Sequence, residues 1–244
     1  MNNSKVNFIT SEASTIRSLV LVNILEMFAC GLSFLIGLPI HSFVLWLIVT
    51  RTESGVASVF FKLNLSVCGI GICVESLIFI LSCWFSSFKK LICFLIGLAV
   101  TGRPLFQCLI CVECYLAVVH PVTFLKYKPL RYKVICSTSA WIIILGSCLF
   151  SVFISPYTIS HTWFFSVQFL LFLCIQLFCL VVVLRALKQS GPGERATEKE
   201  EENHMKRRAF HFILICTVST VIIYPVLYLH RFGKLFCLSS FQVM

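Results

Sequence analysis

The sequence predicts an all-α membrane protein, a bundle of six transmembrane helices. The first observation behind this prediction is composition: 59% of the 244 residues are hydrophobic and 12% are charged, whereas a soluble domain carries about a quarter charged residues. The second is a set of six apolar runs of about 20 residues or more, the length that a helix needs to cross roughly 30 Å of hydrocarbon. None of these runs shows the strict alternation of a membrane barrel strand.

The expected spans fill most of the chain. An extracellular tail of residues 1–26 precedes the bundle of residues 27–230, and an extracellular remnant of residues 231–244 follows it. The first span is expected to serve as the targeting signal, because no basic region with a short apolar stretch precedes it. The six expected spans are 27–50, 60–84, 91–119, 134–154, 163–187 and 209–230.

The basic residues set the expected orientation. With the N-terminus outside, thirteen of the 20 lysines and arginines fall in inner loops, six fall outside, and Arg103 alone lies within a span. This asymmetry agrees with the excess of basic residues that cytosolic loops carry. The sequon Asn2-Asn3-Ser4 then lies in the outer tail, so we expect a glycan at Asn2.

The distribution of charges and cysteines excludes several other classes of protein. The net charge of +10 sits in short loops between apolar runs and forms no basic face for nucleic acid. Most of the 14 cysteines lie within the apolar runs, where a thiol is a small hydrophobic group. Cys108, Cys111 and Cys114 share one helix face, but no histidine or carboxylate completes a metal set with them. No nucleophile–base arrangement is visible, so we expect neither an enzyme nor a cofactor.

The end of the third span carries the most specific motif in the chain. Glu113-Cys114-Tyr115 is followed by Leu-Ala, two valines and His120-Pro121. This stretch resembles the signature of rhodopsin-like (class A) G-protein-coupled receptors, an acidic residue, arginine and tyrosine followed by LAxxHP. The next loop, VTFLKYKPLRYK, is similar to that of the purinergic or nucleotide, lipid and protease-activated receptor branch.

Three further positions carry the resemblance, which extends over about residues 30–230. Asn64 lies in a Leu-Asn-Leu-Ser stretch of the second span, where the family has LNLA. Trp141 occupies the place of the family's tryptophan in the fourth span, and Pro225 that of its proline in the sixth. Each of these matches is weak alone, and together they agree with the motif at the end of the third span.

The resemblance implies a receptor at the plasma membrane that binds an extracellular small ligand or peptide within its bundle. Ligand binding would shift the population toward a state that admits a heterotrimeric G protein. The motif Glu113, Cys114, Tyr115, His120 and Pro121 would face that G protein. The resemblance also implies the lipid bilayer as the surroundings and receptor homo- or hetero-oligomers as further partners.

The chain departs from the family at positions that matter for signalling. Cys114 replaces the arginine that pairs with its acidic neighbour at rest and contacts the G protein when active. Gly69 replaces an aspartate that helps to hold a sodium ion. Met244 follows soon after the last expected span, with no seventh helix. We therefore expect a truncated and signalling-impaired receptor that is partly retained in the endoplasmic reticulum.

Arg103 and the acidic residues of the spans form the candidate polar site. An arginine within a span is unfavourable by roughly 2.5–3.5 kcal/mol, so it needs compensation. Counting about 1.5 Å per residue, Glu75 on the second span lies at a comparable depth, and we expect a Glu75–Arg103 pair that substitutes for the sodium ion. A purely structural pair and an arginine hydrated in a water-filled bundle are the alternatives. Glu113 is expected to anchor basic residues of the following loop.

Two other functions stay open at this point. A small multi-pass transporter would use Glu75 and Arg103 as its substrate or proton path. Inverted repeats would favour it, and none is visible between residues 27–119 and 134–230. A non-signalling partner of full-length receptors is the other alternative.

Overall fold

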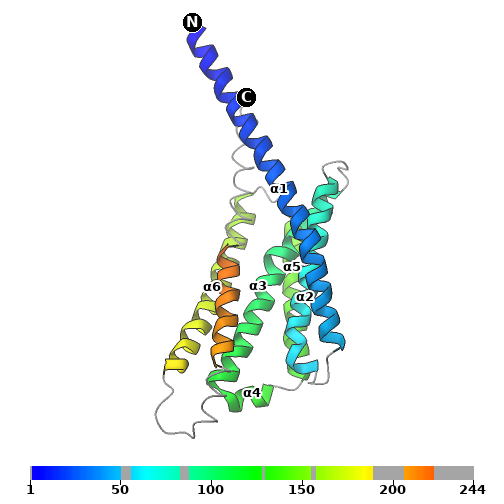
Figure 1. Ribbon diagram of the computed structural model, residues 1–244, viewed down its shortest axis with the longest axis vertical. Helices are drawn as coiled ribbons and strands as arrows, with labels where there is room; N and C mark the ends of the chain where they lie inside the picture. The colour runs from blue at the N-terminus through cyan, green and yellow to red at the C-terminus, as the bar shows by residue number, and fades with distance from the viewer. Residues whose placement is uncertain are drawn as a thin grey trace.

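The bundle consists of parallel and antiparallel long helices. Every element that the computed structural model describes is helical, which confirms the all-α class. Figure 1 shows the long helices packed side by side along one axis, with a short helix, α4, at one end. A helix satisfies its backbone hydrogen bonds internally, as a chain surrounded by lipid requires. The described residues are 2–50, 56–82, 88–127, 130–154, 158–188 and 206–222.

The labelled elements are numbered in chain order. A further helix after the labelled ones covers residues 206–222 and is orange in Figure 1. The labelled helices are α1 (Asn2–Thr50), α2 (Val56–Ser82), α3 (Lys89–Val119), α4 (Pro121–Tyr127), α5 (Leu130–Phe153) and α6 (Ile159–Lys188).

Five of the six predicted spans are confirmed among the described residues as helices long and apolar enough to cross a membrane. Their bounds lie within a few residues of the predicted ones. The sixth predicted span, 209–230, is helical up to residue 222, and its remainder lies outside the described residues. The five spans are Met27–Thr50, Val59–Leu81, Lys90–Val119, Leu130–Phe153 and Ile159–Lys188.

Two segments predicted as a tail and a loop are helical. From Asn2 onward the predicted tail of residues 1–26 belongs to α1, which projects beyond the other helices in Figure 1. The loop after the third span contains α4, which starts at Pro121. Proline suits a first helical turn, because its missing N–H would have no partner there. The predicted remnant of residues 231–244 lies outside the described residues.

α3 is the central helix of the bundle. It packs against α2, α5 and α6, and 67% of its most apolar window is buried, compared with 0% for α1. Phe106 and Ile110 of α3 form the main apolar core with Phe61 of α2 and Ile144 of α5. The outer faces of the helices carry exposed aliphatic and aromatic side chains instead. This is the arrangement expected where lipid takes the place of water.

α3 and α5 are in close backbone contact at Gly97. A Cβ atom added there would lie 2.6 Å from the Cα of Cys148 and 2.8 Å from the carbonyl oxygen of Ser147. Both are backbone atoms, which cannot rotate away as a side chain can. Small residues at helix crossings permit such close backbone contact in membrane bundles. Gly97 therefore sets the distance between α3 and α5.

We expect Gly97→Ala to destabilise the bundle by about 1–3 kcal/mol, as overpacking of a tight contact does. Gly146→Ala is the matched control, because no atom lies within 4 Å of a Cβ added to Gly146 on α5. This control is expected to be neutral or to stabilise by up to about 1 kcal/mol, since alanine is the better helix former. Thermal unfolding in detergent measures both variants, and equal melting temperatures would contradict the assignment.

Candidate functional site

The acidic residue of the family motif forms an ion pair at the end of α3. The Nζ of Lys133 on α5 donates to the Oε1 of Glu113. The side chains are 6% and 19% exposed respectively, so the pair is largely removed from solvent. The Lys133 ammonium also lies 5.7 Å from the ring centre of Phe61 on α2, a cation–π distance. Lys133 thus joins three helices, and it is one of the basic residues expected to partner Glu113.

Cys114, at the position of the family's arginine, packs within the apolar core. It contacts the main core cluster around Phe106 and also a second cluster built by Cys111, Cys179 and Ile213. A thiol fits this environment because it behaves as a small hydrophobic group. The arginine that the resemblance implies here would place a charge between these two apolar clusters.

Tyr115 and His120 of the motif contact each other where α3 ends. The ring of Tyr115 meets the His120 ring edge-on at 5.7 Å and the Phe178 ring at 5.8 Å. The backbone N–H of His120 donates to the carbonyl oxygen of Leu116 at 3.0 Å, which ends the helix before Pro121 begins α4. His120 and Pro121 are both exposed.

Two of the structural positions carried by the resemblance contact each other. The indole N–H of Trp141 on α5 donates to the side-chain oxygen of Asn64 on α2 at 2.9 Å. The Asn64 amide donates in turn to the carbonyl oxygen of Phe60, also at 2.9 Å. Trp141 lies against Phe106 of α3, with ring centres 5.7 Å apart. This contact ties α2, α3 and α5 together. Pro225 and the side chain of Asn2 lie outside the described residues.

Arg103 lies in the middle of α3 and is partly buried. Cys73 of α2, Cys216 of the 206–222 helix and His41 of α1 are close enough to interact with it electrostatically. Glu75 is partly buried on α2, and its pairing with Arg103 stays a prediction. Arg103 therefore occupies a region where side chains of four helices converge.

The glycine at the family's aspartate position makes room for His41. A Cβ atom added to Gly69 would lie 2.6 Å from the Nδ1 atom of the His41 ring. The imidazole of α1 therefore fills the space that a side chain at position 69 would need. The His41 ring in this position requires glycine at position 69, and the region near Arg103 carries an imidazole where the resemblance implies a carboxylate.

Glutamines and threonines, most of them buried, link α3 to its neighbours, and none of them belongs to the motifs recognised in the sequence. The Thr101 hydroxyl donates to the side-chain oxygen of Gln168 on α6 at 3.0 Å. The Thr220 hydroxyl donates to the side-chain oxygen of Gln107 at 3.2 Å, and the Gln176 amide donates to the sulfur of Cys108 at 3.5 Å. Their signal in the sequence is an amide within an apolar span, a group that needs a partner inside the protein.

The described cysteines offer no metal centre. Among the described residues no group of three or more His, Cys, Asp or Glu side chains could hold a metal ion. The thiols of Cys111, Cys179 and Cys216 instead gather in one apolar cluster, and none of these three forms a disulfide.

The chain is similar to two receptors. It is 28% identical to human chemokine XC receptor 1 over 188 residues, which cover 67% of this chain and 54% of that receptor. It is 26% identical to rat hydroxycarboxylic acid receptor 2 over 217 residues, which cover 79% of this chain and 58% of that receptor. Both relatives are class A G-protein-coupled receptors. No profile of a known protein family matches the chain.

The comparison confirms the resemblance to class A receptors at this coarse level. The relatives are receptors rather than enzymes. The chain spans little more than half the length of these relatives, and the expected truncation stays a prediction. The branch within the receptor family stays a prediction as well.

The Glu113–Lys133 pair provides a direct test of the packing at the end of α3. Lys133→Met or Glu113→Leu alone should destabilise by about 3–5 kcal/mol, because each leaves one buried charge unpaired. The double variant should recover most of that loss. Lys62→Met is the control, since Lys62 is exposed at the same end and lies 5.9 Å from the Phe212 ring centre. Additive losses in a thermal-unfolding cycle would show that the two charges do not interact.

A second cycle tests the dependence of Gly69 on His41. Gly69→Ala should lower the melting temperature in detergent, because the added methyl group overlaps the imidazole. In the His41→Ala background the same substitution should be close to neutral, since the ring is gone. A loss of equal size in both backgrounds would show that another neighbour restricts position 69.

Proposed function

We propose that the chain is a rhodopsin-like receptor that binds an extracellular small ligand or peptide within its bundle and couples poorly to a heterotrimeric G protein. The observation that carries this proposal is the end of α3, where Glu113 is paired with Lys133 and Cys114 packs in the apolar core. The proposed location is the plasma membrane, with the N-terminus outside.

The receptor part of the proposal draws support from four observations. The two relatives are receptors of this class, and five described helices are long and apolar enough to span a membrane. The hydrogen bond between Asn64 and Trp141 joins two positions that the resemblance carries. The polar groups of α3 that face α6 and the 206–222 helix lie inside the bundle, where a ligand would act.

The impaired-signalling part follows from the chemistry of two side chains. The family's arginine has a positive charge that engages the acidic neighbour at rest and the G protein when active. The Cys114 thiol has no positive charge and provides neither contact. Glu113 is held by Lys133 of α5, so its charge is compensated within the helical bundle.

The last part of the proposal concerns the role of Arg103. By the resemblance, Arg103 and Gly69 fall at positions where the family holds a sodium ion with an aspartate. We propose that Arg103 substitutes for that ion, with Glu75 as its counter-charge on α2. The chain would then lack the sodium dependence of ligand binding that an aspartate at position 69 confers.

We expect no ligand-driven nucleotide exchange from the chain in lipid nanodiscs with a G-protein heterotrimer. Rat hydroxycarboxylic acid receptor 2 with a hydroxycarboxylic acid is the positive control. Cys114→Arg should not restore exchange and should lower the melting temperature, because position 114 packs against two apolar clusters that a guanidinium would disrupt. Cys136→Arg is the matched control, since Cys136 is exposed near the basic end of α5 and an arginine can extend to the interface there.

Stimulated exchange by the unmodified chain would overturn the impaired-signalling proposal. The same contacts at the end of α3 also favour a non-signalling partner of full-length receptors. Co-expression with human chemokine XC receptor 1 separates the two functions. A change in the surface level of that receptor, without any exchange by the chain itself, would favour the partner role.

A further inference from the structure

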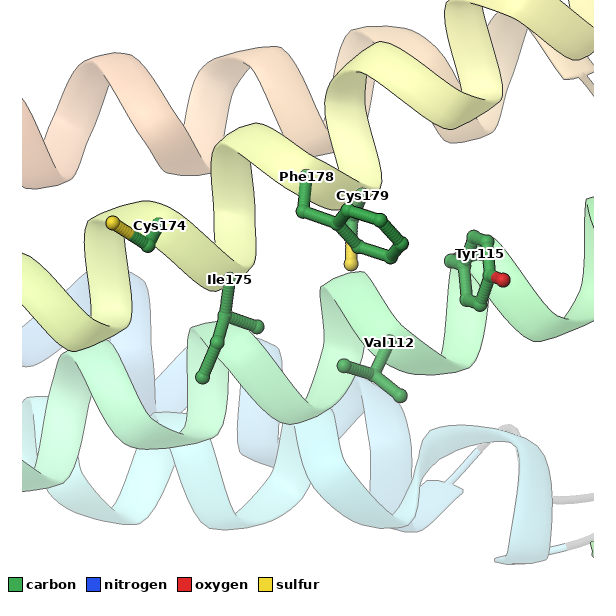
Figure 2. Close-up of a pocket in the computed structure, with 6 residues that line it drawn as sticks. All are labelled: Val112, Tyr115, Cys174, Ile175, Phe178 and Cys179. Carbon is green, nitrogen blue, oxygen red and sulfur yellow. The ribbon is translucent and has the colours of Figure 1, made fainter.

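An apolar groove lies between α3 and α6 in the half of the bundle where α3 ends. Val112 and Tyr115 of α3 face Ile175, Phe178 and Cys179 of α6 across it, with Cys174 at its rim (Figure 2). Its volume is about 390 Å³, within the range of about 300–1,000 Å³ that small-molecule sites have. The Tyr115 hydroxyl carries the only oxygen atom among these six lining side chains.

The groove opens to the outside of the bundle. Cys179 at its inner wall is 1% exposed, whereas Phe178 is 58% exposed and Cys174 is exposed as well. α6 is one of the five membrane-spanning candidates, so its exposed face meets hydrocarbon. A hollow in that face is filled by an apolar chain, because water in the bilayer core would lack hydrogen-bonding partners.

The exposed face of α6 leads from the groove to two basic residues. A stripe at helical spacing continues from Cys174 and Phe178 through Val181 to Arg185 and Lys188, all of them exposed. Arg185 and Lys188 form the basic last turn of α6. Arg185 lies two turns beyond Phe178, about 10 Å along the axis. A long basic side chain there reaches the headgroup region while its stem stays in the apolar layer.

We propose that the groove binds one acyl chain of an anionic phospholipid whose phosphate contacts Arg185 and Lys188. The apolar hollow and the basic residues lie in sequence along one helix face, as the acyl chain and the phosphate do in a phospholipid. Clusters of basic residues beside a membrane span attract anionic headgroups. Tyr115, which lines the groove, contacts the exposed His120 ring at the end of α3. This inference requires the membrane bundle alone and is independent of signalling.

The first experiment measures lipid retention. The chain is purified in detergent from membranes that contain equal amounts of phosphatidylglycerol and phosphatidylcholine, and retained lipid is counted by native mass spectrometry. Phosphatidylglycerol should be retained preferentially, and Arg185→Gln with Lys188→Gln should weaken that retention by roughly an order of magnitude. Arg131→Gln is the charge control, because Arg131 is exposed at the same end but lies on α5.

The second experiment places a probe in the groove without altering the core. Phe178→Trp is a substitution at an exposed position, so the variant should fold normally. Brominated phosphatidylglycerol should quench the introduced indole more strongly than brominated phosphatidylcholine at the same mole fraction. Leu145→Trp on α5, at a position that is 50% exposed, should show no preference between the two lipids.

Three results would overturn the proposal. Equal retention of the two lipids by the unmodified chain would mean that lipid contacts the groove without headgroup selection. Unchanged retention after Arg185→Gln with Lys188→Gln would remove the phosphate contact. Displacement of phosphatidylglycerol by cholesterol at equal mole fraction would assign the groove to a sterol.

Discussion

The bilayer offers no water to hydrogen-bond with, and this constraint determines how α3 sits among its neighbours. A polar side chain within the bundle needs a partner inside the protein, because an unpaired buried polar group is unfavourable by several kcal/mol, on the order of 2–7. Some bond to a carbonyl of their own helix, as Asn64 and Thr217 do, and others reach a neighbouring helix. Thr101 finds its partner on α6, Gln107 on the 206–222 helix and Glu113 on α5. Each pair joins a different neighbour to α3. The polar residues of one helix therefore fix how three others are turned around it.

The sequence was sufficient for the fold class and for five span positions, because both follow from length and hydropathy. It did not show which face of each span is buried in the bundle. The spans are apolar on every side, so periodicity does not show which side is buried. Cys136 and Cys148 lie on the same helix, yet the first is exposed and the second buried. Cys174 and Cys179 of α6 differ in the same way.

The candidate site was likewise predictable from the sequence only in part. The motif at the end of α3 could be recognised from its residues, and a basic partner for Glu113 on the following segment could be anticipated from charge. The contact between His41 and Gly69 could not, because it joins two apolar spans and depends on their rotation. Depth along the membrane predicted Glu75 as a neighbour of Arg103, but depth does not show on which side of its helix a residue lies. The structure adds His41, Cys73 and Cys216 around the same guanidinium.

The contact at Gly97 has a mechanical consequence. Where two helices meet through backbone atoms, no layer of side chains remains between them that could compress or change rotamer. α3 and α5 are therefore held at a fixed spacing at this level, and the Glu113–Lys133 ion pair joins the same two helices nearer the end of α3. α6 meets α3 through the hydrogen bond of Thr101 with Gln168, through apolar clusters such as that of Cys111 and Cys179, and along the open groove. A shift of α5 toward α3 at Gly97 would bring backbone atoms into collision, whereas the α3–α6 boundary keeps side chains and an open groove between the helices.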